Sequence, residues 1–236
     1  MSVYLAAQYT EILGSKNPSE VIAWCVAEFG AEKVVQATSL GAEDQVITAL
    51  LALNGASVGI FTLDTGRLPQ ETYDVIEETR SKYSMEIGMV FPDAGAVEAM
   101  VNSRGPNLFY NSIEGRKLCC QVRKVEPLKR RLAGARAWIC GLRREQAVTR
   151  AGLKVVEWDG QFGVFKISPI ADWTEKQAWE FIKSNGVPYN RLHDRGYPSI
   201  GCACCTRAVE PGKDVRTGRW WWETPEQKEC GLHRQP

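Results

Sequence analysis

The sequence predicts an α/β protein with a mostly parallel, twisted sheet and helices on both of its faces. Short runs rich in Val and Ile alternate with longer amphipathic stretches, which is the pattern of βαβ units. Buried strands are predicted at residues 33–38, 58–63, 85–91 and 137–141, and helices between them at 43–53, 69–83 and 119–132. Ligands of such sheets bind at the carboxyl ends of the strands, so the turns that follow the strands are the expected site.

The two ends of the chain flank this alternation. Helices are predicted at residues 3–13 and 18–29, the second capped by Asn17. After residue 150 the pattern predicts strands at 154–158 and 163–167, and then a helix with the capping box Thr174 and Gln177. From residue 188 regularity fades, and the remainder is expected to cover the core and to end in a mobile tail.

The length and composition favour a single domain. A chain of 236 residues with 44% hydrophobic residues can bury one full core. We therefore interpret residues 1–236 as one domain, with N-terminal helices over 1–30, a binding core over 31–220 and a tail over 221–236.

The net charge and the N-terminus restrict the class of partner and the compartment. A formal net charge of only +1 argues against a nucleic-acid or membrane-surface binder. The N-terminus lacks a basic signal-peptide region, and no apolar run reaches the roughly 20 residues that span a bilayer. We expect a cytoplasmic protein whose eight cysteines serve metal binding or thiol chemistry rather than disulfides.

Two polar turns follow neighbouring predicted strands and together predict one crevice. Backbone N–H groups and hydroxyls in such a turn can hold an anion, although an ordinary helix cap explains the first turn equally well. The residues concerned are Thr38, Ser39, Gly41 and Asp44 in the first turn, and Leu63 and Asp64 in the second.

Basic residues gather in one part of the chain. Residues 116–150 hold eleven Lys or Arg against two acidic residues, which suits a compact anionic ligand. Arginines that follow strands can bind phosphate or sulfate oxygens through two N–H groups, and a solvated basic face is the alternative. The candidates are Arg143 and Arg150, which follow a strand with Gly141, and Arg216 and Arg219 before three consecutive tryptophans.

The cysteine spacing is the most informative pattern. Cys202 and Cys205 are three residues apart, so on a helical turn their thiolates share one face, and Cys204 is expected to point elsewhere. Cys119 and Cys120 are adjacent, so both can bind only from a bent geometry, which an extended cluster tolerates better than a single ion. The alternative is a structural zinc site with a buried thiol pair.

The remaining cysteines and histidines divide by context. Cys25 and Cys140 fall in a predicted helix and strand and are interpreted as buried structural thiols. Cys230 lies in a polar, glycine-flanked tail, where it is either an incidental surface thiol or an exposed nucleophile. His193 and His233 are the only histidines, too few for a histidine-rich metal site.

Seven segments, in this order, carry a resemblance to a known family. They are SLGAED (39–44), LDTGRL (63–68), CCQVRKV (119–125), GLRR (141–144), YPSIGC (197–202), RTGRWWW (216–222) and ECGLH (229–233). Together they resemble the thioredoxin-dependent adenylyl-sulfate (APS) reductases of assimilatory sulfate reduction, the iron–sulfur branch of the PAPS/APS reductase family. The resemblance covers about residues 33–232.

The resemblance implies a fold of the adenine nucleotide α-hydrolase type and a [4Fe–4S] cluster. It implies that Cys119, Cys120, Cys202 and Cys205 hold the cluster, which does not itself carry the electrons. It implies that the two polar turns bind adenosine, and that anions are bound by Lys124, Arg143, Arg150, Arg216 and Arg219. Cys230 on a closing tail would attack the sulfur of APS, release AMP and leave an S-sulfocysteine that reduced thioredoxin cleaves to sulfite.

One residue departs from the family pattern, and other functions remain open. Cys204 stands where the family often has proline, which changes cluster exposure or offers a wrong ligand. A reductase for the 3′-phosphorylated nucleotide (PAPS), or one with dual specificity, is the nearest alternative, and a cluster-binding redox sensor is a non-enzymatic one. An ATP-dependent thiolase or ligase would need a pyrophosphate loop that residues 39–44 lack. The sequence is also compatible with a homo-oligomer.

Overall fold

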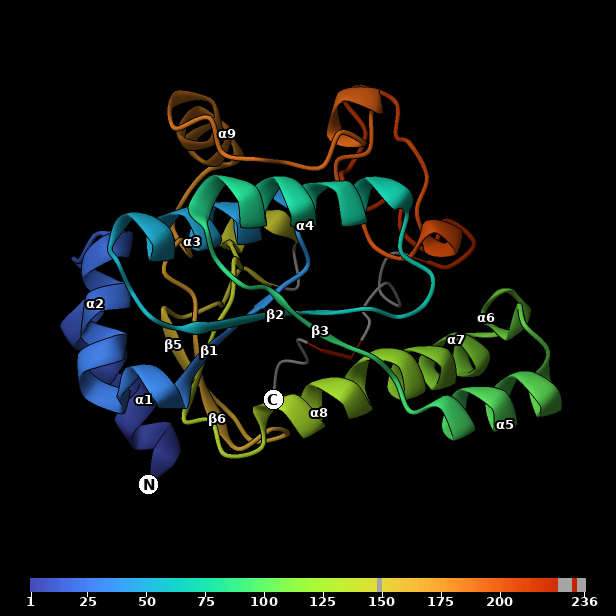
Figure 1. Cartoon of the computed structure of the whole chain (residues 1–236), viewed down its shortest axis with the longest axis horizontal. Helices are drawn as coiled ribbons and strands as arrows, with labels where there is room; N and C mark the ends of the chain where they lie inside the picture. Colours follow the sequence, from blue (N-terminus) through green and yellow to red (C-terminus); the bar gives the residue numbers. More distant parts are fainter. Residues whose placement is uncertain (148–149, 225–230, 233–236) are drawn as a thin grey trace. The chain divides into compact units, whose positions relative to one another are not determined.

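A six-stranded, mostly parallel sheet organises the protein, as predicted (Figure 1). The computed structural model describes residues 1–147, 150–224 and 231–232. The strand order is β3-β2-β1-β4-β6-β5, in which β1 pairs in parallel with β2 and β4, β4 pairs in parallel with β6, and β5 is antiparallel to β6. The strands are β1 (Val34–Thr38), β2 (Gly59–Leu63), β3 (Gly88–Val90), β4 (Ala137–Ile139), β5 (Val156–Asp159) and β6 (Val164–Ile167).

The strands lie where the sequence placed them, and only β3 is much shorter than expected. A strand was predicted over residues 85–91, but only Gly88–Val90 is a strand. The edge position of β3 gives it a partner on one side only, and Pro92 has no N–H to extend the pairing.

The helices begin at the predicted caps. The Asn17 side chain accepts from the backbone N–H of Glu20 at 3.0 Å, and Thr174 and Gln177 form a capping box, as predicted. The α-helices are α1 (Ser2–Leu13), α2 (Pro18–Phe29), α3 (Ala42–Leu53), α4 (Gln70–Tyr83), α5 (Ala94–Arg104), α6 (Leu108–Asn111), α7 (Ile113–Cys120), α8 (Glu126–Leu132) and α9 (Glu175–Ser184).

Residues 119–132 are helical, as predicted, but the middle of the helix is a π-helical turn that the sequence did not indicate. Helix α7 ends at Cys120, a π-helical segment follows over Gln121–Val125, and α8 then begins. Pro127 is the physical reason, because its ring collides with the carbonyl four residues earlier and it has no N–H to donate. A π-helical turn absorbs this misfit, and such turns are frequent at functional sites.

The described chain divides into two compact units that are interleaved in sequence. Unit 1 comprises Met1–Thr62, Thr72–Gly88 and Leu132–Asn190, and unit 2 comprises Leu63–Glu71, Met89–Arg131 and Arg191–Pro236. The interpretation of residues 1–236 as one domain therefore stays a prediction. Within the described residues, no helix has the length and apolar character needed to cross a membrane.

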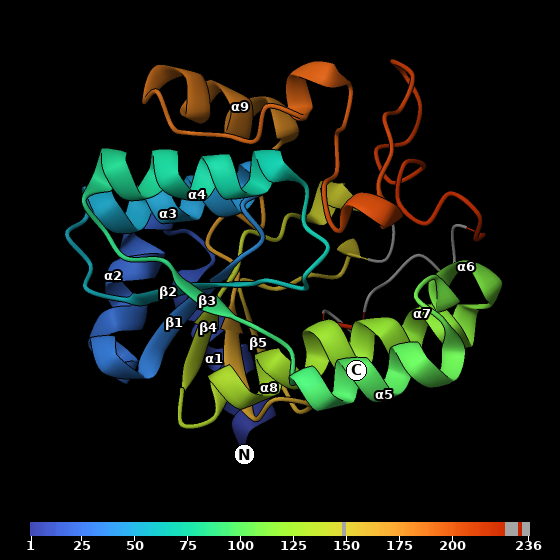
Figure 2. The same cartoon turned by 45° about the vertical axis from the view of Figure 1, so that its right-hand side comes forward.

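Unit 1 contains most of the sheet and its hydrophobic core. Helices α3 and α4 lie on one side of β1 and β2 in both views (Figure 1; Figure 2). Helices α1 and α2 contribute Tyr9 and Phe29, whose rings pack on Phe165 of β6 with centroids 5.5 and 5.3 Å apart. These contacts hold α1 and α2 against β6, the neighbour of β4, whose carboxyl end carries one of the polar turns of this unit.

Unit 2 contains α5 to α7, most of α8 and the part of the chain from Arg191 onward. Helix α5 runs alongside α7 in both views (Figure 1; Figure 2). The hydrophobic core of unit 2 consists of Met100, Leu108, Phe109 and Trp220 together with two buried cysteines, Cys202 and Cys205. Thiols therefore form part of the core of this unit.

Candidate functional site

In unit 1, the turns after β1 and β4 are joined through Asp44. Its half-buried carboxylate accepts from the backbone N–H of Ser39 at 2.7 Å, from the Ser39 hydroxyl at 2.6 Å and from the Gly141 N–H at 2.9 Å. Burial raises the pKa of Asp44, and these hydrogen bonds oppose the rise. A Cβ at Gly141 would lie 2.6 Å from the backbone carbon of Glu43, so only glycine allows this close approach.

The predicted anion ligand Arg143 already has a protein partner. Its Nη2 and Nε donate to the Glu43 carboxylate at 2.7 and 3.1 Å, and the residue is 4% exposed. Gln146 accepts from the Arg143 backbone N–H at 3.1 Å and from the Arg150 guanidinium. The structure thus brings Arg143 and Arg150 together through Gln146, a residue that the sequence analysis did not single out.

The other residues predicted in this unit belong to the same cluster of turns. The Thr38 hydroxyl accepts from the backbone N–H of Leu40 at 3.0 Å, and Leu40 has a left-handed φ of 60°. Gly41 caps α3 without a side-chain hydrogen bond. The arrangement presents backbone groups and a helix N-terminus, which is a suitable environment for a polar or anionic ligand.

In unit 2, the turn after β2 contacts the Cys202 segment. Leu63 ends β2, and Asp64 is buried and accepts from the Gly66 N–H at 2.7 Å. The Thr65 hydroxyl lies 3.2 Å from the Sγ of Cys202, and the carbonyl of Arg67 accepts from Ala203 N–H at 2.8 Å. This turn therefore supports the cysteine-bearing segment directly.

Four cysteines from two distant segments line one cavity of unit 2. Cys119 and Cys120 lie in the last turn of α7, before the π-helical segment, while Cys202 caps a single 3-10 turn and Cys205 ends it. Cys120, Cys202 and Cys205 are buried, and Cys119 is half-buried. The remaining lining residues are Arg67, Phe109, Arg116, Arg123, Lys124, Cys204 and Trp220.

The chemistry of this cavity fits a cluster held by thiolates. Its lining holds four cationic side chains and no carboxylate among the described residues. Burial raises the pKa of Cys119, and the attraction of Arg123 and Lys124 opposes this rise, so these cations favour the thiolate that metals require. Across the described part of the chain, no three His, Cys, Asp or Glu side chains converge on a single metal ion. A multi-iron cluster does not require such convergence, because each thiolate binds a different iron.

The expectation that Cys204 points away from the other cysteines is wrong. Its Sγ lies 3.8 Å from the Sγ of Cys205, and it lines the same cavity. Cys204 lies in a 3-10 turn of only three residues, not in an α-helix. The Tyr110 hydroxyl donates to the Cys204 carbonyl at 2.8 Å, so Cys204 contacts the rest of unit 2. A hydrogen bond from Cys205 lowers the pKa of Cys204 to about 6, and the attraction of Arg67 acts in the same direction. The same hydrogen bond, together with burial, raises the pKa of Cys205.

In unit 2, three arginines surround the ring of Trp220. The guanidinium carbons of Arg116, Arg219 and Arg216 lie 4.7, 4.8 and 5.9 Å from the ring centroid. Arg219 is buried and donates to the Ser199 hydroxyl at 3.2 Å. The structure therefore places Arg216 and Arg219 next to the cysteine cavity, which Lys124 also lines.

Several other candidates are settled by position. Cys25 and Cys140 are buried as predicted, and burial raises the pKa of each thiol to about 12. His193 lies half-buried in a short 3-10 helix. Cys230 and His233 lie outside the described residues.

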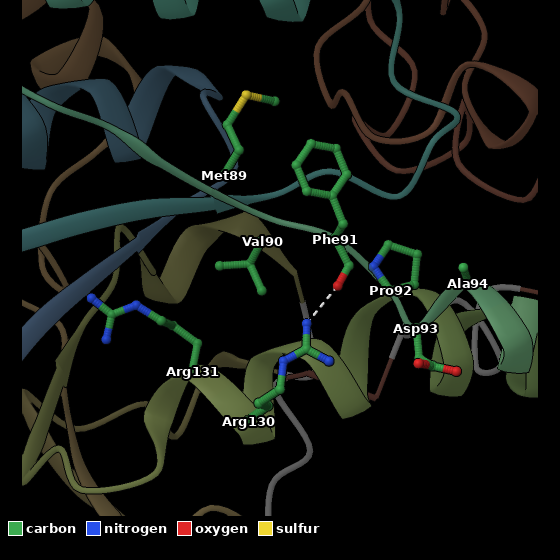
Figure 3. A pocket seen from close by; sticks show the side chains of 8 residues that line it. All are labelled: Met89, Val90, Phe91, Pro92, Asp93, Ala94, Arg130 and Arg131. Carbon is green, nitrogen blue, oxygen red and sulfur yellow. Dashed lines mark hydrogen bonds between the residues drawn. The ribbon is translucent and has the colours of Figure 1, made fainter.

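An open pocket of about 570 Å³ in unit 2 was not anticipated from the sequence (Figure 3). It lies between the segment Met89–Ala94 and the exposed arginines Arg130 and Arg131 of α8. Arg130 donates to the carbonyl of Phe91 at 2.6 Å. None of the sequence-predicted site residues lines it.

Comparisons with known proteins show the family to which the chain belongs. The family model described as phosphoadenosine phosphosulfate reductase domain matches residues 33–208. The chain is 54% identical over 204 residues to the adenosine 5′-phosphosulfate reductase of Allochromatium vinosum, covering 86% of this chain and 80% of that one. It is 52% identical over 202 residues to that of Burkholderia cepacia, covering 86% and 81%.

A solved structure supports the same conclusion. The crystal structure of phosphoadenylyl-sulfate (PAPS) reductase from Candida auris, a phosphate complex, matches with a TM-score of 0.73 at 28% identity, covering 86% of this chain and 96% of that one. The predicted adenine nucleotide α-hydrolase-like fold is thereby confirmed. The chain belongs to the phosphoadenosine phosphosulfate reductase domain family.

Proposed function

We propose that this protein reduces adenosine 5′-phosphosulfate to sulfite and AMP in assimilatory sulfate reduction in the cytoplasm. The observation that carries the proposal is the cavity lined by Cys119, Cys120, Cys202 and Cys205, in a chain similar to proteins named adenosine 5′-phosphosulfate reductase. A cavity of thiols lined by cations suits an enzyme that handles anionic sulfur compounds beside a thiolate-held group.

The covalent step belongs to Cys230. Its thiolate attacks the sulfur of APS, an S–S bond forms, the bond between sulfur and the phosphate oxygen breaks, and AMP leaves. A thiolate of reduced thioredoxin then attacks the Cys230 sulfur and releases sulfite. The second thioredoxin thiol completes a thioredoxin disulfide and regenerates the Cys230 thiol, so the two electrons come from that dithiol.

The described residues bind the two ends of the nucleotide. The turns that contain Thr38, Ser39, Gly41, Asp44 and Gly141, with Leu63 and Asp64, would hold the adenosine. Lys124, Arg143, Arg150, Arg216 and Arg219 would hold the phosphate and sulfonate oxygens. Fixed cationic donors stabilise the charge that develops on those oxygens as AMP leaves.

The four cavity cysteines would hold a [4Fe–4S] cluster. Bound there, it would supply structural order and fixed charge next to Lys124, because the thioredoxin dithiol supplies the electrons. Ligation requires Cys205 as a thiolate, so the hydrogen bond that it donates to Cys204 is then lost.

Mass spectrometry after incubation with APS alone tests the proposed function. The peptide that contains Cys230 should gain about 80 Da, the mass of one SO₃ group, as a trapped covalent intermediate. Reduced thioredoxin should remove the adduct and release sulfite. Cys230→Ser should form no adduct and no sulfite while it still binds AMP, and an adduct on Cys204 instead would mean that the nucleophile is misassigned.

PAPS reduction is the second candidate, because the Candida auris structure is that of a PAPS reductase. Sulfite formation from APS and from PAPS by the purified protein separates the two. We expect the larger kcat/KM with APS, because the curated relatives named above are adenosine 5′-phosphosulfate reductases. Sulfite formation from neither nucleotide would favour a cluster-binding redox sensor.

A further inference from the structure

A buried ion pair fastens residues 220–224, here called the C-terminal segment, to helix α7. Arg116 Nε and Nη2 donate to the two carboxylate oxygens of Glu223 at 2.7 and 2.9 Å. The side chains are only 1% and 2% exposed. Two parallel N–H···O bonds between planar groups fix orientation as well as distance, so the pair sets the direction in which the chain passes Glu223.

The backbone forms a turn from Trp220 to Glu223, just before the ion pair. Trp220 has a left-handed φ of 39°, and its N–H donates to the Cys205 carbonyl at 3.3 Å. Its carbonyl in turn accepts from the N–H of Glu223 at 2.8 Å. A bulky residue keeps such a φ only where its surroundings hold it, and here the ring is buried beneath Arg116 and Arg219.

The ion pair also lies at the cysteine cavity. Arg116 is one helical turn before Cys120 on α7 and lines the cavity together with Trp220. This guanidinium therefore contacts both the cavity, which it lines, and Glu223, with which it pairs. Helix α7 therefore both carries Cys119 and Cys120 and holds the C-terminal segment through Arg116.

The distance along the chain gives this anchor a consequence for Cys230. Glu223 precedes Cys230 by seven residues. Seven residues span at most about 25 Å even when fully extended. Holding Glu223 therefore limits the reach of the Cys230 thiol to about 25 Å from this anchor and raises its effective concentration at the cavity relative to an unanchored tail.

We propose that Arg116 and Glu223 are positioning residues that hold the root of the C-terminal tail at the cysteine cavity, so that Cys230 is delivered to the sulfur of the nucleotide. This rests on the proposed function, in which Cys230 is the nucleophile. Neither residue contacts the reacting atoms. The transfer of SO₃ to Cys230 depends on these two residues. The binding of nucleotide and of the cluster does not depend on them.

Glu223→Gln tests the proposal, because it keeps the size of the side chain and removes its charge. At saturating APS, the single-turnover rate of adduct formation on Cys230 should fall about ten- to a hundredfold, the scale for a misplaced reacting group. Amide hydrogen exchange over residues 220–224 should become faster. Iron content and AMP affinity should equal those of the wild type.

Arg116→Lys should act in the same direction, since a point charge cannot replace the two-pronged contact. The exposed residues Glu210 and Lys117 give matched controls. Glu210→Gln and Lys117→Arg should leave the single-turnover rate and the amide exchange unchanged.

An unchanged single-turnover rate in Glu223→Gln would overturn the proposal. So would a loss of iron in proportion to the loss of rate, because the pair would then hold the cavity rather than the tail. If the wild type itself forms no adduct, the proposed function fails, and unchanged amide exchange over residues 220–224 would then reject the anchor separately. If Glu223→Gln is insoluble, Glu223→Asp is judged by the same measurements.

Discussion

The carboxylate of Asp44 accepts a hydrogen bond from the backbone N–H of Gly141 at 2.9 Å, which joins the turn after β1 to the turn after β4. Ser39 donates to the other carboxylate oxygen. Both carboxylate oxygens of the half-buried Asp44 are used in these contacts, so its first role is to shape the turns. Any effect of this residue on nucleotide binding has to be separated from that role.

Asp44→Asn should lower the free energy of unfolding by about 2 kcal/mol, because an amide NH₂ would face an N–H donor and leave it unsatisfied. Urea denaturation of the nucleotide-free protein measures this. The exposed Glu11 of α1 provides the control, and Glu11→Gln should change stability by less than about 0.5 kcal/mol. Equal stability of both variants would show that the turns do not depend on the carboxylate.

Arg143→Met should lower the free energy of unfolding by about 3 kcal/mol, because it removes one partner of a largely buried ion pair. This loss should be present without nucleotide. Glu43→Gln should cost less, since the amide oxygen still accepts a hydrogen bond from Arg143. If Arg143→Met weakens AMP binding but leaves stability unchanged, the arginine serves the ligand alone.

Anaerobically purified protein should contain about four irons and four sulfides per chain, the content of one cubane cluster. Cys202→Ser and Cys205→Ser should lose the iron and unfold more easily, because metal binding is coupled to folding. Cys204→Ser should retain the iron. Iron loss in Cys204→Ser, measured by the same metal analysis, would make Cys204 a ligand in place of one of the four.

Arg216→Ala and Arg219→Ala should each reduce kcat/KM for APS by an amount equal to about 2–4 kcal/mol, the scale for removing one preorganised donor to a developing charge. Steady-state sulfite formation measures this. Gly201→Ala provides a subtler test, because a Cβ there would lie 2.3 Å from the Arg219 guanidinium and displace it. Wild-type kinetics in all three variants would return these arginines to a structural role.

Alkylation of the native protein at pH 8 should leave Cys25 and Cys140 unmodified. Burial raises the pKa of both thiols to about 12, so their reactive thiolate forms only as the pH rises far above 8. Peptide mapping after iodoacetamide treatment measures this, and unfolding in urea should make both cysteines reactive. Rapid labelling of Cys140 in the folded protein would contradict its assignment as a buried structural thiol.

The strands and the capped helices could be predicted because their signals are local. The Val-rich runs of β1 and β2 and the Asn17 cap require only neighbouring residues to define them. Helix α5 was not predicted, since its apolar residues do not recur at helical spacing, although Asp93 caps it. The π-helical turn after Cys120 was missed because the effect of Pro127 on the preceding turn was not considered.

The cysteines of the candidate site could be predicted from spacing and resemblance, but their surroundings could not. The pairing of Arg116 with Glu223 joins residues 107 positions apart, and neither residue has a local pattern that indicates it. The Arg143 contact with Glu43 is similar, because the sequence marks Arg143 as a basic residue after a strand and gives no sign of its partner. Long-range contacts of this kind follow from the fold, not from the local sequence.

The two cysteine pairs of the cavity are made at different times during synthesis of the chain. Eighty-two positions separate Cys120 from Cys202, and most of the intervening residues, Leu132–Asn190, belong to unit 1. At about 5–20 residues per second, Cys119 and Cys120 leave the ribosome roughly 4–16 s before the second pair. Until then these two thiols have no cavity to enter and stay exposed to oxidants and stray metals, so a nascent chain is most vulnerable in this interval.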